Sequence, residues 1–366
     1  MLQALAYDFR RTVLTLEVPD FDTIDRFYGT SLAADRSAID VRRASPRAAA
    51  VVGALPRRLD RVKSALLFRA ARRIGRAFDL TITADGEADL GVPGIQYVHF
   101  PRRLYTPAAS PIARVYGAAM DRVDPRPRAA IARNTTLVNS AWTAAKMREA
   151  WGVESEIVYP PVAWTSPLVS WDARANGIVA VGRLAPEKDL EKIIRIVGRV
   201  RTHGHDLHLH VVGSDDPSHR GYARRVRAEM GSHAWITLHE QIARVDLERL
   251  IATNRYGIHG TVDEHFGIAI AEMIRGGAIV FAAAGGGASE IVDDPRLRYA
   301  SEEEAVARIA DVVSSPARQA SLVASLAQSA ERFAPDRFMA AIRDVALRLG
   351  PSPRAPATRL YAGPRR

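Results

Sequence analysis

The stretch that decides the fold runs from Gly177 to Gly213 and reads GIVAVGRLAPEKDLEKIIRIVGRVRTHGHDLHLHVVG. It opens on GIVAVG, an apolar run typical of a strand that is buried on both faces. Apolar residues then recur at helical spacing: Leu190, Ile193, Ile194, Val197 and Val200. The stretch closes on LHLHVVG (207–213), a second apolar strand. Strand, amphipathic helix and strand make one βαβ unit, which predicts a parallel sheet.

The same alternation continues on both sides of this unit. Downstream, the pattern predicts strands at 235–238, 256–260 and 278–282, and helices at 222–230, 245–253, from 267, 316–331 and 335–349. Upstream, it predicts strands at 12–18, 79–84, 94–99, 135–139 and 156–159. Residues 162–176 show no periodicity and are interpreted as a domain linker. The fold class is therefore α/β, with two doubly wound parallel sheets and a cleft between them.

Composition excludes several classes of protein. The 366 residues are 47% hydrophobic and 25% charged, as in an ordinary globular chain. The absence of cysteine excludes disulfides, a thiolate nucleophile and Cys-bound zinc. The sequence contains four lysines, 47 arginines and 41 acidic residues, which gives a net charge of +10. Coding bias explains most of this excess, although a basic chain also suits phosphate-bearing partners.

Targeting signals are not visible in the sequence. The first residues, MLQALAYDFRR, lack the apolar core of a signal peptide, and no run of 18 apolar residues occurs. We therefore expect a protein without a membrane span.

The first chemical motif is VGRLAPEKD (181–189), where a strand ends on glycine and two cations follow. Arg183 offers a bidentate fork and Lys188 a point charge, the two ways in which proteins bind phosphate. Asp189 is expected to cap the next helix. A solvated loop with surface charges explains the same spacing equally well.

The second motif is EHFGIAIAE (264–272), with seven residues between two carboxylates. If the whole span were helical, Glu264 and Glu272 would be about 12 Å apart along the axis. That separation suits two contacts that bracket a long ligand, and Gly267 allows backbone amides to approach it. An ordinary amphipathic helix with an acidic start is the alternative.

Two weaker signals accompany these motifs. The run GGGASE (285–290) follows a predicted strand, and glycines before a helix can cradle a phosphate or simply form a turn. His99 ends the strand GIQYVH, a position that faces the cleft in doubly wound sheets, although a structural histidine is the default interpretation.

Two other patterns are set aside. The D-x-D at Asp20 and Asp22 falls at a predicted helix start, where capping explains it better than a metal site. His208 and His210 share one face of a strand, but no third ligand is obvious for a metal ion.

Taken together and in this order, VGRLAPEKD, EHFGIAIAE and GGGASE resemble the motifs of the retaining glycosyltransferases of family 4, which have the GT-B fold. In the first half, NSAWT (139–143), VYPP (158–161) and IQYVHFP (95–101) resemble the branch that contains lipid-linked oligosaccharide mannosyltransferases. The resemblance covers about residues 10 to 350.

The resemblance implies a domain plan. An acceptor-side Rossmann-like domain would span 1–165, and a nucleotide-sugar-binding domain would span 172–335. A last helix, 336–350, would cross back to the first domain. The tail 351–366, rich in Pro, Arg and Ala, is expected to be disordered.

The resemblance also implies donor-binding residues. Arg183 and Lys188 would bind the donor diphosphate and stabilise the departing nucleotide. Phe266, Gly267 and Ile268 would offer backbone N–H groups to the sugar and the phosphate. Fixed cations and amides of this kind stabilise leaving-group charge.

Three further side chains receive roles by resemblance. Glu264 would contact the transferred sugar, and His99 would lie near the reacting face of that sugar; these two are the catalytic candidates. Glu272 would hold the ribose hydroxyls. Such enzymes retain the anomeric configuration and usually need no metal, so no metal or other cofactor is expected beyond the nucleotide-sugar co-substrate.

The sequence departs from the family pattern at its start. GT-B enzymes open with a strand and a glycine-rich loop, whereas residues 1–10 read as a helix and contain no glycine. We therefore expect the first strand and this loop to be missing from the N-terminal domain.

The expected function is transfer of a hexose, mannose from GDP-mannose, to a lipid-linked or other glycan acceptor. The expected location is the cytoplasm, at the inner face of an anionic membrane. Three alternatives remain: a free sugar or sugar phosphate as acceptor, a non-catalytic GT-B remnant, and a nucleic-acid binder. The last would show steep salt dependence, but no basic motif interleaved with aromatic residues is present.

Overall fold

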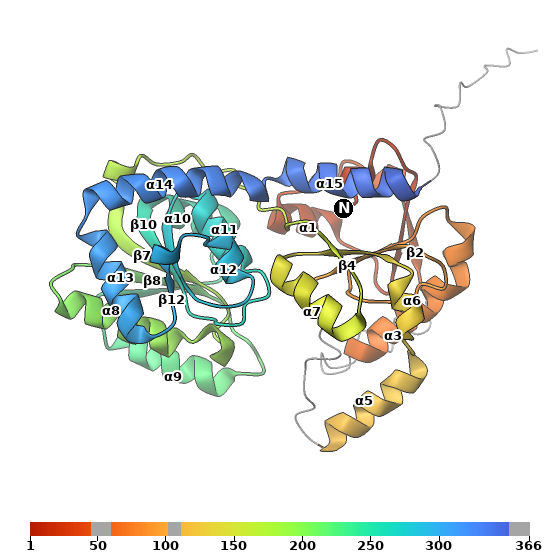
Figure 1. Ribbon diagram of the computed structural model, residues 1–366, viewed down its shortest axis with the longest axis horizontal. Coiled ribbons are helices and arrows are strands. Elements are labelled where there is room, and N and C mark those ends of the chain that lie inside the picture. Colours follow the sequence, from red (N-terminus) through yellow and green to blue (C-terminus); the bar gives the residue numbers. More distant parts are fainter. Residues whose placement is uncertain (45–59, 102–110, 351–366) are drawn as a thin grey trace, which may run out of the picture.

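The computed structural model describes residues 1–44, 60–101 and 111–350. Within these residues the chain forms two α/β bodies side by side, joined by the segment after β6 and by the long blue helices α14 and α15 (Figure 1). We call the elements from β1 to β6 the N-terminal domain and those from β7 to α14 the C-terminal domain. The predicted tail, 351–366, lies outside the described residues.

The C-terminal domain contains a six-stranded parallel sheet in the order β12-β11-β10-β7-β8-β9. Its strands are β7 (Ala175–Val181), β8 (His208–Gly213), β9 (Ile236–Glu240), β10 (Asn254–His259), β11 (Ile279–Ala283) and β12 (Arg298–Tyr299). The helices between and after them are α8 (Leu190–Thr202), α9 (Arg220–Gly231), α10 (Arg244–Thr253), α11 (Ile268–Arg275), α12 (Ala288–Ile291), α13 (Glu302–Val313) and α14 (Pro316–Ala330). The βαβ unit predicted from 177–213 is confirmed, whereas α13 and β12 were not predicted.

One core holds this domain together. The apolar stripe of α8 is buried against the sheet, as its helical spacing predicts. The strands contribute apolar side chains to both faces, among them the fully buried rings of Tyr256 and Phe281. Burial on both faces is the property that the continuous apolar run of β7 indicated.

The N-terminal domain contains two separate parallel sheets. β1 (Arg11–Thr15) pairs with β2 (Ile39–Arg43). The second sheet, in the order β3-β4-β5-β6, consists of β3 (Ile82–Thr83), β4 (Ile95–Val98), β5 (Thr135–Val138) and β6 (Glu156–Ile157). The helices are α1 (Phe21–Tyr28), α3 (Asp60–Ile74), α5 (Pro111–Val123), α6 (Arg128–Ala132) and α7 (Ala141–Trp151).

The start of the chain follows the sequence prediction. Residues 3–5 form a short 3-10 helix, and neither a strand nor a glycine precedes β1 among the described residues. The predicted strands 12–18 and 79–84 are shorter in the structure, where they are β1 and β3.

Helix α15 (Pro335–Leu349) lies along the N-terminal domain (Figure 1). Its buried side chains Phe338, Ile342 and Val345 share a hydrophobic cluster with Ile95 and Tyr97 of β4. The chain thus leaves the C-terminal domain and packs its last helix on the first. The limits predicted at residues 165 and 172 fall between β6 and β7 and remain predictions.

Local signals set the helix ends near the domain junction. The side chain of Ser140 accepts a hydrogen bond from the amide of Thr143, and Gly152 adopts the left-handed conformation after α7. Asp20 caps α1 in the same way, which supports capping as the reason for the D-x-D. No helix in the described ranges is long and apolar enough to cross a bilayer.

Candidate functional site

Lys188 and Glu264 meet where two neighbouring strands end. Lys188 follows β7, Glu264 follows β10, and these strands are paired in parallel. The Lys188 ammonium lies 2.7 Å from the Glu264 carboxylate, and each side chain is about one-fifth exposed. The lysine stem passes over Gly182, where a Cβ would lie 3.1 Å from Lys188 Cγ. The carboxyl edge of the sheet therefore brings together one residue from each of the first two motifs.

His259 is the second partner of Glu264. It is the last residue of β10, is 3% exposed, and its Nε2 lies 3.0 Å from a Glu264 oxygen. Burial alone would raise the pKa of Glu264. The hydrogen bond from His259 and the charge of Lys188 outweigh burial and lower that pKa to about 2. Glu264 is therefore ionised throughout the physiological range.

The segment after Glu264 leads into α11. Phe266 is 3% exposed and packs its ring against those of Tyr159 and Phe333. Gly267 has a φ of +103° at the N-cap of α11, and Ile268 opens the helix with an exposed side chain. The amides in the first turn of a helix have no intrahelical acceptor. Phe266, Gly267 and Ile268, which the sequence predicted to bind the donor, thus lie beside Glu264. The Phe266 side chain packs in the hydrophobic core.

The glycine run 285–287 packs directly on this segment. A Cβ on Gly286 would lie 2.2 Å from the backbone oxygen of Glu264, and one on Gly287 would lie 2.4 Å from that of His265. The Gly287 amide donates to the Glu264 backbone oxygen at 2.6 Å. The run therefore has a structural reason: only glycine allows the two backbones to come this close.

Gly286→Ala is expected to lower the free energy of unfolding by about 3 kcal/mol, because the new methyl group meets backbone and the φ of +55° is strained. Urea unfolding measures the loss. Gly204→Ala is the matched control, since Gly204 has a φ of +91° with nothing within 4 Å. Its loss should be about 1 kcal/mol. Equal losses in the two variants would contradict the close contact.

Arg183 lies in two ion pairs and does not share the contact between Lys188 and Glu264. Its guanidinium pairs with Glu187 and with Asp216, and the side chain is 55% exposed. The structure therefore places Arg183 at the surface of the loop after β7, where a ligand has to compete with two carboxylates.

Glu272 lies on α11 and is 13% exposed. Its carboxylate pairs with Arg244 at the start of α10, and Arg244 also contacts Glu248 at 3.0 Å and the Ala163 oxygen at 2.8 Å. Glu248 in turn accepts hydrogen bonds from the amides of residues 165 and 166. Glu272 is thus tied to the segment that joins the domains.

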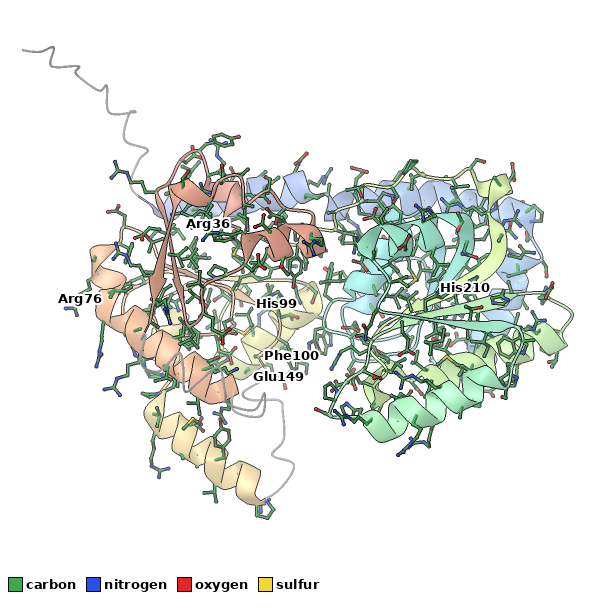
Figure 2. All side chains as sticks on the ribbon, turned by 180° about the vertical axis from the view of Figure 1, so that it is seen from behind. Arg36, Arg76, His99, Phe100, Glu149 and His210 are labelled. Carbon is green, nitrogen blue, oxygen red and sulfur yellow. The ribbon has the colours of Figure 1, made fainter. Side chains whose placement is uncertain are left out.

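His99 and Phe100 lie on the side of the N-terminal domain that faces the C-terminal one (Figure 2). The exposed His99 follows β4 and packs edge-on against Tyr97, with ring centroids 5.0 Å apart. Its backbone oxygen accepts a hydrogen bond from Asn139 at 3.0 Å. Phe100 crosses to the other domain and stacks on His265, with ring centroids 3.9 Å apart.

One detail of the sequence prediction is wrong. Asp189 stands before α8 with a φ of 50°, but its side chain caps nothing; it pairs with Lys192 at 2.6 Å. The helix predicted from residue 267 is α11, which begins at Ile268. Only part of the span from Glu264 to Glu272 is therefore helical, and the distance for a fully helical span does not apply.

Sequence reasoning missed His259 and Arg244. His259 ends a parallel strand, the same signal that singled out His99, so the sequence contained the information needed to find it. Arg244 had no comparable signal, because it stands out only through its contact with Glu272.

The histidines on β8 contact each other and a histidine of β9. His208 and His210 do share a face, with ring centroids 4.7 Å apart, and His210 contacts His239 at 3.1 Å. Across the residues that the structure describes, no group of three or more His, Cys, Asp or Glu side chains is arranged to hold a metal ion.

Comparison with known proteins finds a family model that matches the C-terminal domain. Residues 170–332 match the model of the family described as glycosyl transferases group 1. Among curated relatives, the human GDP-Man:Man(3)GlcNAc(2)-PP-Dol alpha-1,2-mannosyltransferase is 26% identical over 228 residues, which cover 56% of this chain and 46% of the relative. The protein of that name from Candida glabrata is 27% identical over 171 residues, or 42% of this chain and 34% of the relative. The chain thus spans about a third to a half of the length of these relatives.

Solved structures share the fold over nearly the whole chain. Sucrose-phosphate synthase from Thermosynechococcus elongatus superposes with a TM-score of 0.69 at 15% identity, covering 94% of this chain and 90% of that one. Anabaena HepE, solved with UDP and glucose, gives 0.66 at 16% identity and covers 94% of each chain. With its two parallel-sheet domains, the chain has the GT-B fold; residues 170–332 match the group 1 glycosyl transferases, and the protein resembles the mannosyltransferases of lipid-linked oligosaccharides.

Proposed function

We propose that the protein is a retaining glycosyltransferase that moves mannose from GDP-mannose to a lipid-linked glycan acceptor. The observation that carries this proposal is the contact of 2.7 Å between Lys188 and Glu264 at the carboxyl edge of the sheet. It joins the cation of one motif to the acid of the next, although 76 residues separate them. The curated relatives, whose names specify GDP-mannose and a dolichol-linked oligosaccharide, support this choice of donor and acceptor.

The chemistry that we propose is electrostatic. The bond between the sugar C1 and the phosphate oxygen breaks, and a bond from C1 to the acceptor oxygen forms, with release of the acceptor proton. The Lys188 ammonium and the amides at the start of α11 stabilise the diphosphate that leaves. We propose Arg183 as a second cation for this charge, freed from Glu187 and Asp216 when donor binds.

The remaining predicted residues complete the proposed site. Glu264, held ionised by His259 and Lys188, contacts the transferred sugar from the C-terminal domain. His99, on the N-terminal domain, lies near the reacting face of that sugar. Glu272 binds the ribose through the carboxylate oxygen that Arg244 does not hold. Because cations and amides take the leaving-group charge, we propose that turnover needs no metal ion or other cofactor.

The membrane is proposed as the place of action. A lipid-linked acceptor is presented at a bilayer surface, and the net charge of +10 favours approach to an anionic one. We propose the cytoplasmic side, where nucleotide-sugars are available to the enzyme.

A transfer assay with a donor panel tests the proposal. Radiolabelled GDP-mannose, UDP-glucose and UDP-N-acetylglucosamine are offered with a lipid-linked oligosaccharide in anionic vesicles, with and without EDTA. We expect label from GDP-mannose only, unaffected by EDTA, and the same anomeric configuration in donor and product by NMR. Transfer only to a free sugar or sugar phosphate would favour the first alternative. Absence of any nucleotide-sugar binding by calorimetry would favour a non-catalytic remnant.

A further inference from the structure

Glu290 ends the third sequence motif and has no role in the proposed donor site. It projects from α12 of the C-terminal domain toward the N-terminal domain. Its Oε2 accepts a hydrogen bond from the Ala141 amide at 2.7 Å, and its Oε1 accepts one from the Tyr159 hydroxyl at 2.5 Å. These partners lie 149 and 131 residues away in the sequence.

Both contacts suit a carboxylate. Ala141 is the first residue of α7, an 11-residue helix, and a negative charge is stabilised at a helix N-terminus. Tyr159 is half-buried; burial and the neighbouring Glu290 raise the pKa of its hydroxyl to about 12, so it stays a donor. Hydrogen bonds to an ionised acceptor are about twice as strong as neutral ones.

A second set of contacts joins the same end of α7 to the segment after Glu264. The Ser140 hydroxyl donates to the backbone oxygen of His265 at 2.8 Å. The rings of Phe100, Trp142 and His265 lie nearly parallel, and the centroids of Trp142 and His265 are 5.7 Å apart. The N-terminal domain therefore contacts His265, which is the residue next to Glu264, the proposed sugar contact.

The two sets of contacts are parts of one unit. Glu290 belongs to the turn that begins at the glycine run, because its amide donates to the Gly287 oxygen at 3.1 Å. The Gly287 amide in turn holds the backbone oxygen of Glu264. Helix α7 is therefore held at two points, Glu290 and His265, of a unit that also fixes the backbone of Glu264.

We propose that Glu290 is a positioning residue, which latches the N-terminus of α7 to the C-terminal domain and so couples domain closure to the placement of Glu264. The contacts of its carboxylate with Ala141 and Tyr159 form what we call the Glu290 latch. This inference rests on the proposed function for its effect on turnover, but the latch itself is a property of the chain without ligand.

Three variants test the latch. Glu290→Gln removes the charge and turns one acceptor into a donor, Tyr159→Phe removes only a hydroxyl, and the double variant combines them. Glu303→Gln, a surface acid that is 73% exposed, is the matched control. We expect each latch variant to increase the radius of gyration measured by small-angle scattering without ligand, while far-UV circular dichroism stays unchanged.

Kinetics separate positioning from donor binding. We expect kcat to fall about 10- to 100-fold in Glu290→Gln, the range for loss of a charged hydrogen bond. The dissociation constant of GDP should stay within about twofold, because the proposed contacts to the diphosphate and the ribose all come from the C-terminal domain. The double variant should lose little more than Glu290→Gln alone, since both changes break one contact.

The outcomes are distinct. An unchanged radius of gyration and kcat in Glu290→Gln would overturn the latch, as would a loss of GDP affinity that matches the loss of kcat. If the wild type does not bind GDP or transfer mannose, the proposed function fails. The scattering comparison then still tests whether Glu290 holds the two domains together, because that measurement needs no ligand.

Discussion

Lys188→Gln is expected to lower kcat with GDP-mannose by about 100- to 1000-fold, the cost of removing one preorganised group that stabilises leaving-group charge. The Lys188 side chain is four-fifths buried and its ammonium lies 2.7 Å from Glu264, so its position is set before a donor arrives. Glutamine keeps a similar length and a donor but loses the charge. A steady-state transfer assay measures the effect.

The control for this variant is Lys146→Gln. Lys146 lies on α7 and forms an ion pair with Glu149. A surface ion pair contributes little, so kcat should stay near that of the wild type. An unchanged kcat in Lys188→Gln would contradict the role that the proposed function gives to the contact between Lys188 and Glu264.

Glu264→Gln is expected to change how stability depends on pH. The pKa of Glu264 is lowered from its ordinary value near 4.5 to about 2. Because the folded-state pKa is the lower one, the ionised carboxylate stabilises the protein above the unfolded-state pKa. That contribution is lost as pH falls from about 4.5 toward 2. At 1.36 kcal/mol per pKa unit it amounts to about 3 kcal/mol.

Urea unfolding of both proteins at several pH values measures this effect. The wild type should be the more stable at pH 7, and its advantage over Glu264→Gln should shrink by about 3 kcal/mol as pH falls toward 2. Glu331→Gln removes a carboxylate that is 67% exposed, and its curve should follow that of the wild type. A constant gap between the wild type and Glu264→Gln would contradict the buried cluster with Lys188 and His259.

Local sequence patterns predicted much of the fold. The apolar run and the helical spacing of 177–213 are decided by residues close together in the chain, and the structure has β7, α8 and β8 there. Ser140 and Gly152 mark the ends of α7 for the same reason, since a cap acts on backbone within one turn.

Local patterns did not decide which partner a polar group takes. Asp189 has the residue type and place of a helix cap, but its carboxylate pairs with Lys192, three residues along the chain. The glycine run 285–287 has the sequence of a ligand cradle or a turn, whereas its packing against the backbone at Glu264 decides its form.

The sequence by itself determined that the chain is an α/β protein with three motifs in a fixed order, because hydrophobic period and residue type act locally. Only the tertiary structure decided which charges meet: Lys188 with Glu264 and His259, Arg244 with Glu272, and Glu290 with the N-terminus of α7. Each of these contacts joins a side chain to a group on a different element or loop. The physical reason is that a charge pairs with whatever the packing of distant elements places within reach, and no local pattern records that partner.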